Sequence, residues 1–179
     1  MKYFNIKALL ESDEPGYCDF TISSKDTLED LHHAILKAYR FSGEQMASFY
    51  ETNEDWDIIE EIPLIAIDPN YDGTLMKDVL ISKLIAEVGD QMIYIYDYLN
   101  EWKFYIEIME IETAKPEKTT PLMLKRFGKV PNEHDKDISG VDAEKILMNA
   151  ILGDEFDDDD DDDYGSDNFE SLDDYEEYL

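Results

Sequence analysis

The sequence predicts an α+β fold, namely a roll in which a mixed or antiparallel sheet of about five or six strands packs on one main helix. Two observations support this class. Apolar residues recur at helical spacing over residues 28–39, and such a stripe needs a sheet face to cover it. Polar and apolar residues alternate in short segments on both sides of that helix, as they do in half-buried strands.

The first two strands are predicted over residues 2–10 and 17–23, where side chains alternate with a period of two. Pro15 and Gly16 lie between these segments and indicate a turn. Because the connection is short, we expect the two strands to pair as a hairpin.

The main helix follows, and its apolar stripe is the clearest periodic pattern in the chain. Asp26 is the expected N-cap, with Glu29 three residues later as in a capping box. Ser42 and Gly43 are expected to close the helix. The stripe consists of Leu28, Leu31, His32, Ile35, Leu36 and Tyr39.

The middle of the chain is less regular. Residues 46–51 alternate and predict a third strand, whereas residues 54–61 are acidic and expected to be irregular. Pro63 limits residues 62–67 to an edge strand at most. Residues 79–88 suit a short helix. The expected order is therefore β-β-α-β-α-β-β.

Two strands, residues 91–98 and 103–112, are rich in Ile and aromatic residues and are expected to form a second hairpin through Asn100. Residues 122–127 predict a last short strand. A short helix is expected over residues 143–151, ending at Gly153.

The sequence divides into an α+β domain of residues 1–130, a linker with a short helix over 131–153, and an acidic tail of 154–179 that is predicted to be disordered. The tail holds 15 carboxylates and no Lys or Arg, which is half of the net charge of −30. A chain of this sign repels phosphate backbones and anionic lipid, so we expect no direct binding to nucleic acid or membrane.

The charge favours a basic protein as the partner, since blocks of like charge often serve as interaction tails. A tail that only keeps the protein in solution is the competing interpretation. The residues predicted to contact the partner are Phe156, Asp157, Asp158, Asp159, Asp160, Asp161, Asp162, Asp163 and Tyr164.

Several features favour a cytoplasmic protein. The sequence shows no apolar run of about 18–20 residues and no signal-peptide core. Cys18 is the single cysteine, so an internal disulfide is impossible. The sequence indicates no particular oligomeric state.

Few residues indicate a catalytic or metal-binding role, and no cofactor motif is recognisable. Asp68, Asn70 and Asp72 resemble the start of a calcium loop, but Val79 stands where that loop needs a bidentate Glu, so an ordinary turn is the competing interpretation. His32 lies on the apolar stripe and is expected to be a hydrogen-bonded core histidine. Trp102 is also expected in the core, because it directly precedes a strong strand.

Three segments together resemble the plasmid pRiA4b ORF-3-like family, whose fold is described as MM3350-like. They are residues 27–35, 79–85 and 94–102, and they place His32, Asp97 and Trp102 at family-motif positions. The resemblance covers about residues 1–130 and implies an α+β roll without an established biochemical activity. The chain departs from the family at residues 18–20 and 46–49, where the family's basic and histidine residues are absent.

These observations lead to three hypotheses on function. The first is a non-enzymatic protein-interaction module whose acidic tail engages a basic partner. The second is a metal-dependent or hydrolytic enzyme with a site near His32 and Asp97. The third is an accessory factor in DNA transactions associated with mobile elements, acting through a basic protein. We favour the first, because no catalytic motif is present.

Overall fold

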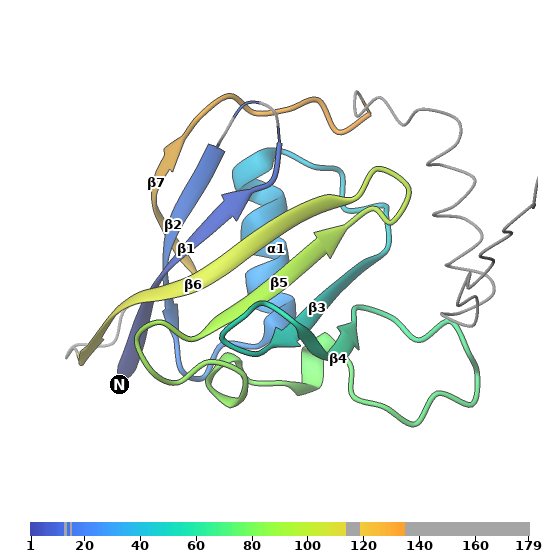
Figure 1. The fold of residues 1–179 in the computed structure, drawn as a ribbon, viewed down its shortest axis with the longest axis horizontal. Coiled ribbons are helices and arrows are strands. Elements are labelled where there is room, and N and C mark those ends of the chain that lie inside the picture. Colours follow the sequence, from blue (N-terminus) through green and yellow to red (C-terminus); the bar gives the residue numbers. More distant parts are fainter. Residues whose placement is uncertain (13, 15, 114–118, 135–179) are drawn as a thin grey trace, which may run out of the picture.

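The computed structural model describes residues 1–12, 14, 16–113 and 119–134. Within these residues, one sheet of seven strands, in the order β4-β3-β5-β6-β1-β2-β7, carries one α-helix against one face (Figure 1). All six strand pairings are antiparallel. The predicted α+β class with one main helix is confirmed, while the sheet has more strands than expected.

The elements follow one another along the chain without a repeat. They are β1 (Lys2–Leu10), β2 (Gly16–Ser23), α1 (Leu28–Tyr39), β3 (Ala47–Thr52), β4 (Ile58–Pro63), the 3₁₀ turns η1 (Met76–Asp78) and η2 (Ile81–Lys83), β5 (Gln91–Tyr96), β6 (Trp102–Thr113) and β7 (Leu122–Phe127). The predicted helix at 143–151 and the acidic tail lie outside the described residues.

The hairpin of β1 and β2 is confirmed, with a register that runs from Tyr3 opposite Ser23 to Leu10 opposite Gly16. The second predicted hairpin, β5 with β6, is also confirmed. The last strand, β7, forms where it was expected and pairs with β2 at one edge of the sheet.

The N-cap of α1 is Thr27, so the prediction of Asp26 was wrong by one residue. The Thr27 hydroxyl accepts from the backbone N–H of Asp30 at 3.2 Å, and the Asp30 carboxylate accepts from the N–H of Thr27 at 2.8 Å. Asp26 instead accepts from the N–H of Ser23 at 2.8 Å and holds the preceding turn. The helix ends at Tyr39, and its C-cap is Arg40 in the left-handed conformation with φ 58°, rather than Ser42 or Gly43.

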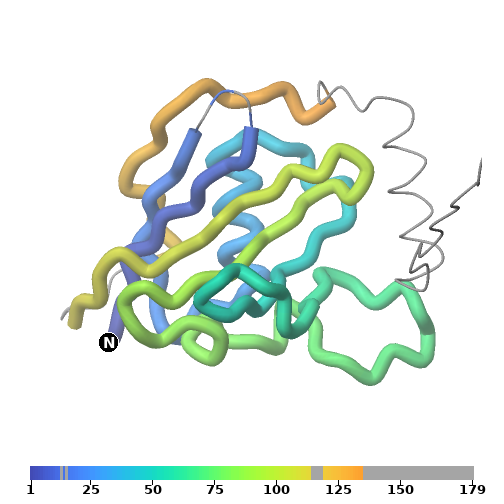
Figure 2. Tube along the Cα trace, viewed as in Figure 1, coloured from blue at the N-terminus to red at the C-terminus, as the bar shows by residue number. Residues whose placement is uncertain are grey.

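The prediction that residues 54–61 are irregular was also wrong. β4 begins within this segment and pairs with β3 through a tight turn, in which the Asn53 side chain accepts from the N–H groups of Asp55 and Asp57, both at 2.9 Å. Of residues 62–67, predicted to form an edge strand at most, only Ile62 and Pro63 belong to a strand: they end β4, which is an edge strand. Figure 2 shows how the following loop, residues 64–75, projects beside β4.

The short helix predicted over 79–88 does not form: η1 precedes this segment, and only the 3₁₀ turn η2 lies within it. Part of the backbone here bonds to the start of α1 and to the turn before it: the Leu28 N–H donates to the Val79 carbonyl at 3.0 Å, and the Ile81 N–H donates to the Asp26 carbonyl at 2.9 Å. Tertiary pairing therefore overrides the helical spacing of its apolar residues.

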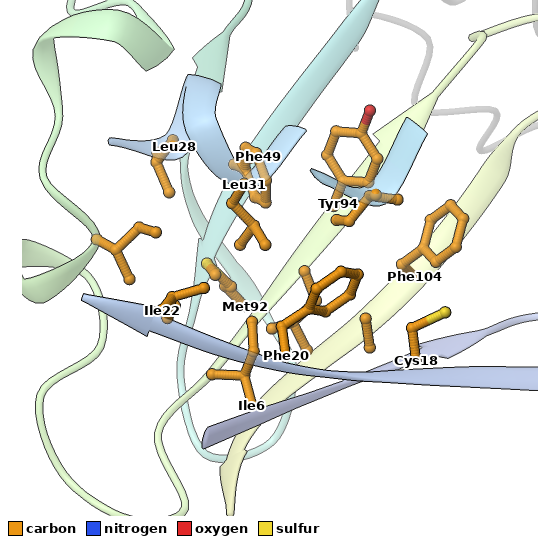
Figure 3. Packing of buried hydrophobic residues seen from close by; sticks show 14 of the residues in the cluster. Ile6, Cys18, Phe20, Ile22, Leu28, Leu31, Phe49, Met92, Tyr94 and Phe104 are labelled. Atoms are coloured by element: carbon orange, nitrogen blue, oxygen red, sulfur yellow. The ribbon is translucent and has the colours of Figure 1, made fainter. Parts of the chain in front are cut away.

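The core lies between α1 and the inner face of the sheet (Figure 3). Leu28 and Leu31 of α1 point toward Phe20 and Ile22 of β2, and Phe49 of β3, Tyr94 of β5 and Phe104 of β6 belong to the same core. Within the described part of the chain, no helix has the length and apolarity that a membrane crossing requires.

Candidate functional site

A groove of about 590 Å³ opens on the outer face of the sheet, opposite α1. Its sheet residues alternate with core residues: Tyr50 follows the buried Phe49, and Ile95 lies between the buried Tyr94 and Tyr96. The loop of residues 64–75 and the β5–β6 turn complete its rim. The groove is lined by Met46, Tyr50, Glu61, Pro63, Ile65, Ala66, Ile67, Asp68, Tyr71, Ile95, Tyr98 and Glu101.

The Glu61 carboxylate is the polar centre of this groove. One of its oxygens, Oε1, accepts hydrogen bonds from the hydroxyls of Ser48 at 2.6 Å, Tyr98 at 3.2 Å and Tyr50 at 3.4 Å. The hydroxyls of Ser48 and Tyr98 also contact each other. Strand pairing explains the cluster, since Tyr50 lies directly opposite Glu61 and Ser48 is two residues away on the same face of β3.

The hydroxyls around Glu61 are protonated donors at neutral pH. Burial raises the pKa of Tyr98 to about 12, and the nearby Glu61 carboxylate adds to this shift. Burial also raises the pKa of Tyr50 above its usual value, and the Glu61 carboxylate makes the second largest contribution. Both tyrosine hydroxyls therefore keep their protons and can donate to Glu61 Oε1.

The walls of the groove are apolar and its surroundings are acidic. Ile65 is 52% exposed and Ile67 is 78% exposed, so the loop presents bare aliphatic surface. Residues 41–76 contain no Lys or Arg. Their nine carboxylates are Glu44, Glu51, Glu54, Asp55, Asp57, Glu60, Glu61, Asp68 and Asp72.

Chemically, this combination suits a cation that carries an alkyl stem. Tyrosine rings attract cations over their faces, and aliphatic walls pack against the methylene groups of Lys or Arg. A carboxylate already oriented by neutral donors provides the counter-charge. Among the described residues, no group of three or more His, Cys, Asp or Glu side chains could hold a metal ion.

His32, a family-motif position, lies in the core as predicted. It is 2% exposed, and its Nδ1 lies 2.7 Å from the Tyr94 hydroxyl. Burial, with a smaller contribution from the neighbouring His33, lowers the pKa of His32 to about 4. The ring is therefore neutral at pH 7 and contributes to packing.

Asp97 and Trp102, the other two motif positions, shape the β5–β6 turn. The Asp97 carboxylate accepts from the N–H of Leu99 at 3.1 Å and from the side-chain amide of Asn100 at 2.6 Å. Trp102 is 4% exposed, which confirms its predicted place in the core. Neither residue lines the groove, and His32 does not either. A catalytic site near His32 and Asp97 stays a prediction.

A buried carboxylate at Glu133 was not anticipated from the sequence. It is 8% exposed and accepts from the Tyr96 hydroxyl at 2.6 Å and from the N–H and hydroxyl of Ser42 at 2.6 and 2.8 Å. The Glu133 carbonyl accepts from the Trp102 indole at 3.1 Å. Burial raises the pKa of Glu133, but the hydrogen bonds from Tyr96 and Ser42 outweigh it, and the net pKa lies below its usual value.

The calcium-loop candidate folds as a turn. The Asp68 carboxylate accepts from the backbone N–H of Asn70 at 2.8 Å, and the Asp68 carbonyl accepts from the N–H of Tyr71 at 3.0 Å. Asp68 thereby lines the groove, while Asp72 does not. Calcium binding stays a prediction. The predicted partner-binding residues 156–164 lie outside the described residues.

The fold and the groove define an α+β protein in which one helix packs on a mostly antiparallel sheet and the opposite face carries a groove lined in part by carboxylates. The chain belongs to the plasmid pRiA4b ORF-3-like protein family, whose model matches residues 2–173. The resemblance inferred from three short segments is confirmed, and the match extends beyond residue 130.

A solved structure supports the fold. The crystal structure of MM3350, a protein of unknown function from Methanosarcina mazei Go1, superposes with a TM-score of 0.62 at 19% sequence identity. The match covers 87% of this chain and 91% of that chain. The search of curated proteins returned no match.

Proposed function

We propose that this protein is a non-enzymatic binding module that engages a basic protein partner. The groove around Glu61 carries the proposal, because it combines an oriented carboxylate with tyrosine rings and aliphatic walls. Such a site is complementary to the side chain of Lys or Arg, whose charge and alkyl stem are both accommodated.

The acidic tail provides the second part of the proposed mechanism. Seven consecutive aspartates, residues 157–163, flanked by Phe156 and Tyr164, attract a basic surface over long range. The groove then selects a particular side chain at short range. The net charge of −30 repels nucleic acid and anionic membranes, so both stay outside the proposed range of direct ligands.

The proposal includes a cytoplasmic location, which fits a chain with a single cysteine. A role as an accessory factor in DNA transactions is compatible with it only if a basic protein mediates the contact. The enzymatic hypothesis receives no support from the groove, whose lining includes neither His32 nor Asp97.

The test compares the full-length chain with a variant in which all seven aspartates of residues 157–163 are replaced by Asn. Both are used to capture proteins from a native lysate at low salt, and bound proteins are eluted at high salt and identified. We expect the full-length chain to capture basic proteins that the Asn variant does not, because the variant lacks the seven charges. Salt should release these proteins, because charge attraction between exposed groups is screened beyond about 8–10 Å at physiological salt.

An empty list, or a list shared by both proteins, would contradict the role of the tail. Capture of nucleic acid by the purified chain would contradict the charge argument itself. A Glu61→Gln variant, tested in parallel, separates the contribution of the groove from that of the tail.

A further inference from the structure

Strand β4 forms one edge of the sheet, and within the described residues no strand pairs with its outer side. An unpaired edge presents a row of backbone donors and acceptors to which another extended chain can bond. Addition of a peptide strand to such an edge is a recurring mode of recognition. The position of β4 therefore raises the question of what pairs with it.

The side chains of β4 select among possible partners. Ile58 and Ile59 are 56% and 62% exposed, so the edge offers apolar contacts. Glu60 and Glu61 follow them, and no Lys or Arg occurs anywhere in residues 41–76. Two copies of this acidic edge would repel each other. A strand that carries positive charge would instead be attracted.

The groove and the β4 edge are continuous, because Glu61 and Pro63 belong to the strand and also line the groove. A strand that pairs with β4 would run about 4.8 Å away and direct alternate side chains to the outer face of the sheet. A long cationic side chain on that face is within reach of Glu61 and the tyrosines around it.

We propose that β4 and the adjoining groove dock an extended peptide segment of the partner, with Lys or Arg alternating with apolar residues. The peptide would add to β4 as an eighth strand of the sheet, and one cationic side chain would lie on Glu61. This inference deepens the proposed function and rests on it: it specifies the conformation and side-chain pattern of the segment that the basic partner supplies.

The probe is a capped synthetic peptide of about eight residues that alternates Lys with Ile and is labelled for fluorescence anisotropy. Three forms are titrated with the full-length chain: this peptide, the same peptide with Glu in place of Lys, and the Lys peptide with alternate backbone N–H groups methylated. Methylation removes the backbone donors that strand pairing needs and leaves the charge in place.

The matched pair of protein variants is Glu61→Lys and Glu87→Lys. Both make the same change in charge at an exposed glutamate, but only Glu61 lines the groove. We expect Glu61→Lys to weaken binding by about tenfold or more, and Glu87→Lys by about twofold. The methylated peptide and the Glu peptide should each lose about tenfold or more.

Equal losses for the two variants, or full binding by the methylated peptide, would overturn the inference. So would a mass that rises with concentration in light scattering and returns to that of a monomer in an Arg126→Glu variant, because the occupant of β4 would then be strand β7 of a second copy. Binding that persists at about 0.5 M salt, where charges are screened beyond about 4 Å, supports the strand contact independently of the tail.

The two proposals can fail separately. Peptide binding that depends on Glu61 but not on the aspartates 157–163 would retain the β4 site and reject the tail. If binding is lost when those aspartates are replaced, but is unchanged by Glu61→Lys and by backbone methylation of the peptide, the acidic tail is retained as the contact and the strand contact is rejected.

Discussion

At the scale of single residues, three carboxylates have different structural roles because their surroundings differ. Glu133 is buried under donors from strand β5 and from the loop after α1, and it fixes the end of the described chain on the body. Asp97 accepts from its own turn. Glu61 is bonded through one oxygen to three hydroxyls, yet it stands at the surface beside a groove. Of these three carboxylates, only Glu61 lines the groove.

The buried His32 predicts an acid-sensitive fold. Its pKa is about 4 in the folded state against an ordinary value of 6.5, so the unfolded chain binds the proton more readily. The stability that the neutral ring contributes is fully present above pH 6.5 and is lost as the pH falls toward 4. The expected loss is about 2 kcal/mol in unfolding free energy between pH 7 and pH 5.

Urea denaturation at both pH values measures this loss. A His32→Gln variant should be less stable at pH 7 and should lose much less between the two values. The control is His33→Gln, which alters the exposed neighbouring ring and should keep the acid sensitivity. An unchanged difference in His32→Gln would contradict the assignment.

The Glu133 anchor gives a second prediction. Glu133→Gln removes a charge-assisted acceptor for Tyr96 and Ser42 and should weaken the attachment of residues 128–134 by about 2 kcal/mol. Because the folded pKa of Glu133 is lowered, the anchor is complete above the ordinary glutamate pKa and weakens as the pH falls through the lowered one.

Hydrogen exchange of this segment and the fluorescence of Trp102, whose indole donates to Glu133, report the attachment. The control is Glu14→Gln, which removes an exposed carboxylate 3.9 Å from Lys129. Equal effects of the two substitutions would mean that general charge, rather than the buried hydrogen bonds, holds the segment.

At the scale of elements, periodicity predicted those parts of the fold whose burial alternates regularly. The two hairpins and α1 follow from it. β4 was missed because Ile58 and Ile59, and then Glu60 and Glu61, occur as pairs instead of alternating. Its register also shifts between Glu51 and Thr52 of the partner strand, which breaks the period of two.

The candidate site could not be predicted for the same reason. Glu61 becomes distinct from the other eight carboxylates of residues 41–76 only once β4 pairs with β3 and places it opposite Tyr50. The groove also needs Tyr98, which reaches Glu61 from a turn between two later strands. Such long-range convergence leaves no local pattern in the sequence.

The capping box of α1 gives a prediction at this scale. Thr27→Ala removes the side-chain acceptor for the Asp30 N–H and should lower the free energy of unfolding by about 1 kcal/mol. Thr119→Ala, outside the helix, serves as the control. Urea denaturation measures both, and a similar small effect for the two would contradict the role of Thr27 as N-cap.

At the scale of the whole molecule, the two edges of the sheet differ in charge. The β4 edge lies in a stretch of 36 residues, 41–76, without a basic side chain, whereas β7 carries Lys125 and Arg126 among its six residues. The Lys125 ammonium donates to Tyr17 at 3.2 Å, and the Arg126 guanidinium donates to the Ala38 carbonyl at 3.3 Å, so these cations are directed partly onto the body. This asymmetry favours the β4 side as the docking surface of the proposed basic partner.

The most direct test of this account is amide hydrogen exchange of the full-length chain with and without the alternating Lys–Ile peptide. The account predicts slower exchange in residues 58–63, with residues 122–127 unchanged, because a strand that pairs with β4 protects its backbone N–H groups. Slower exchange confined to β7, or to the tail of residues 154–179, would contradict the claim that the groove and the β4 edge form the partner surface.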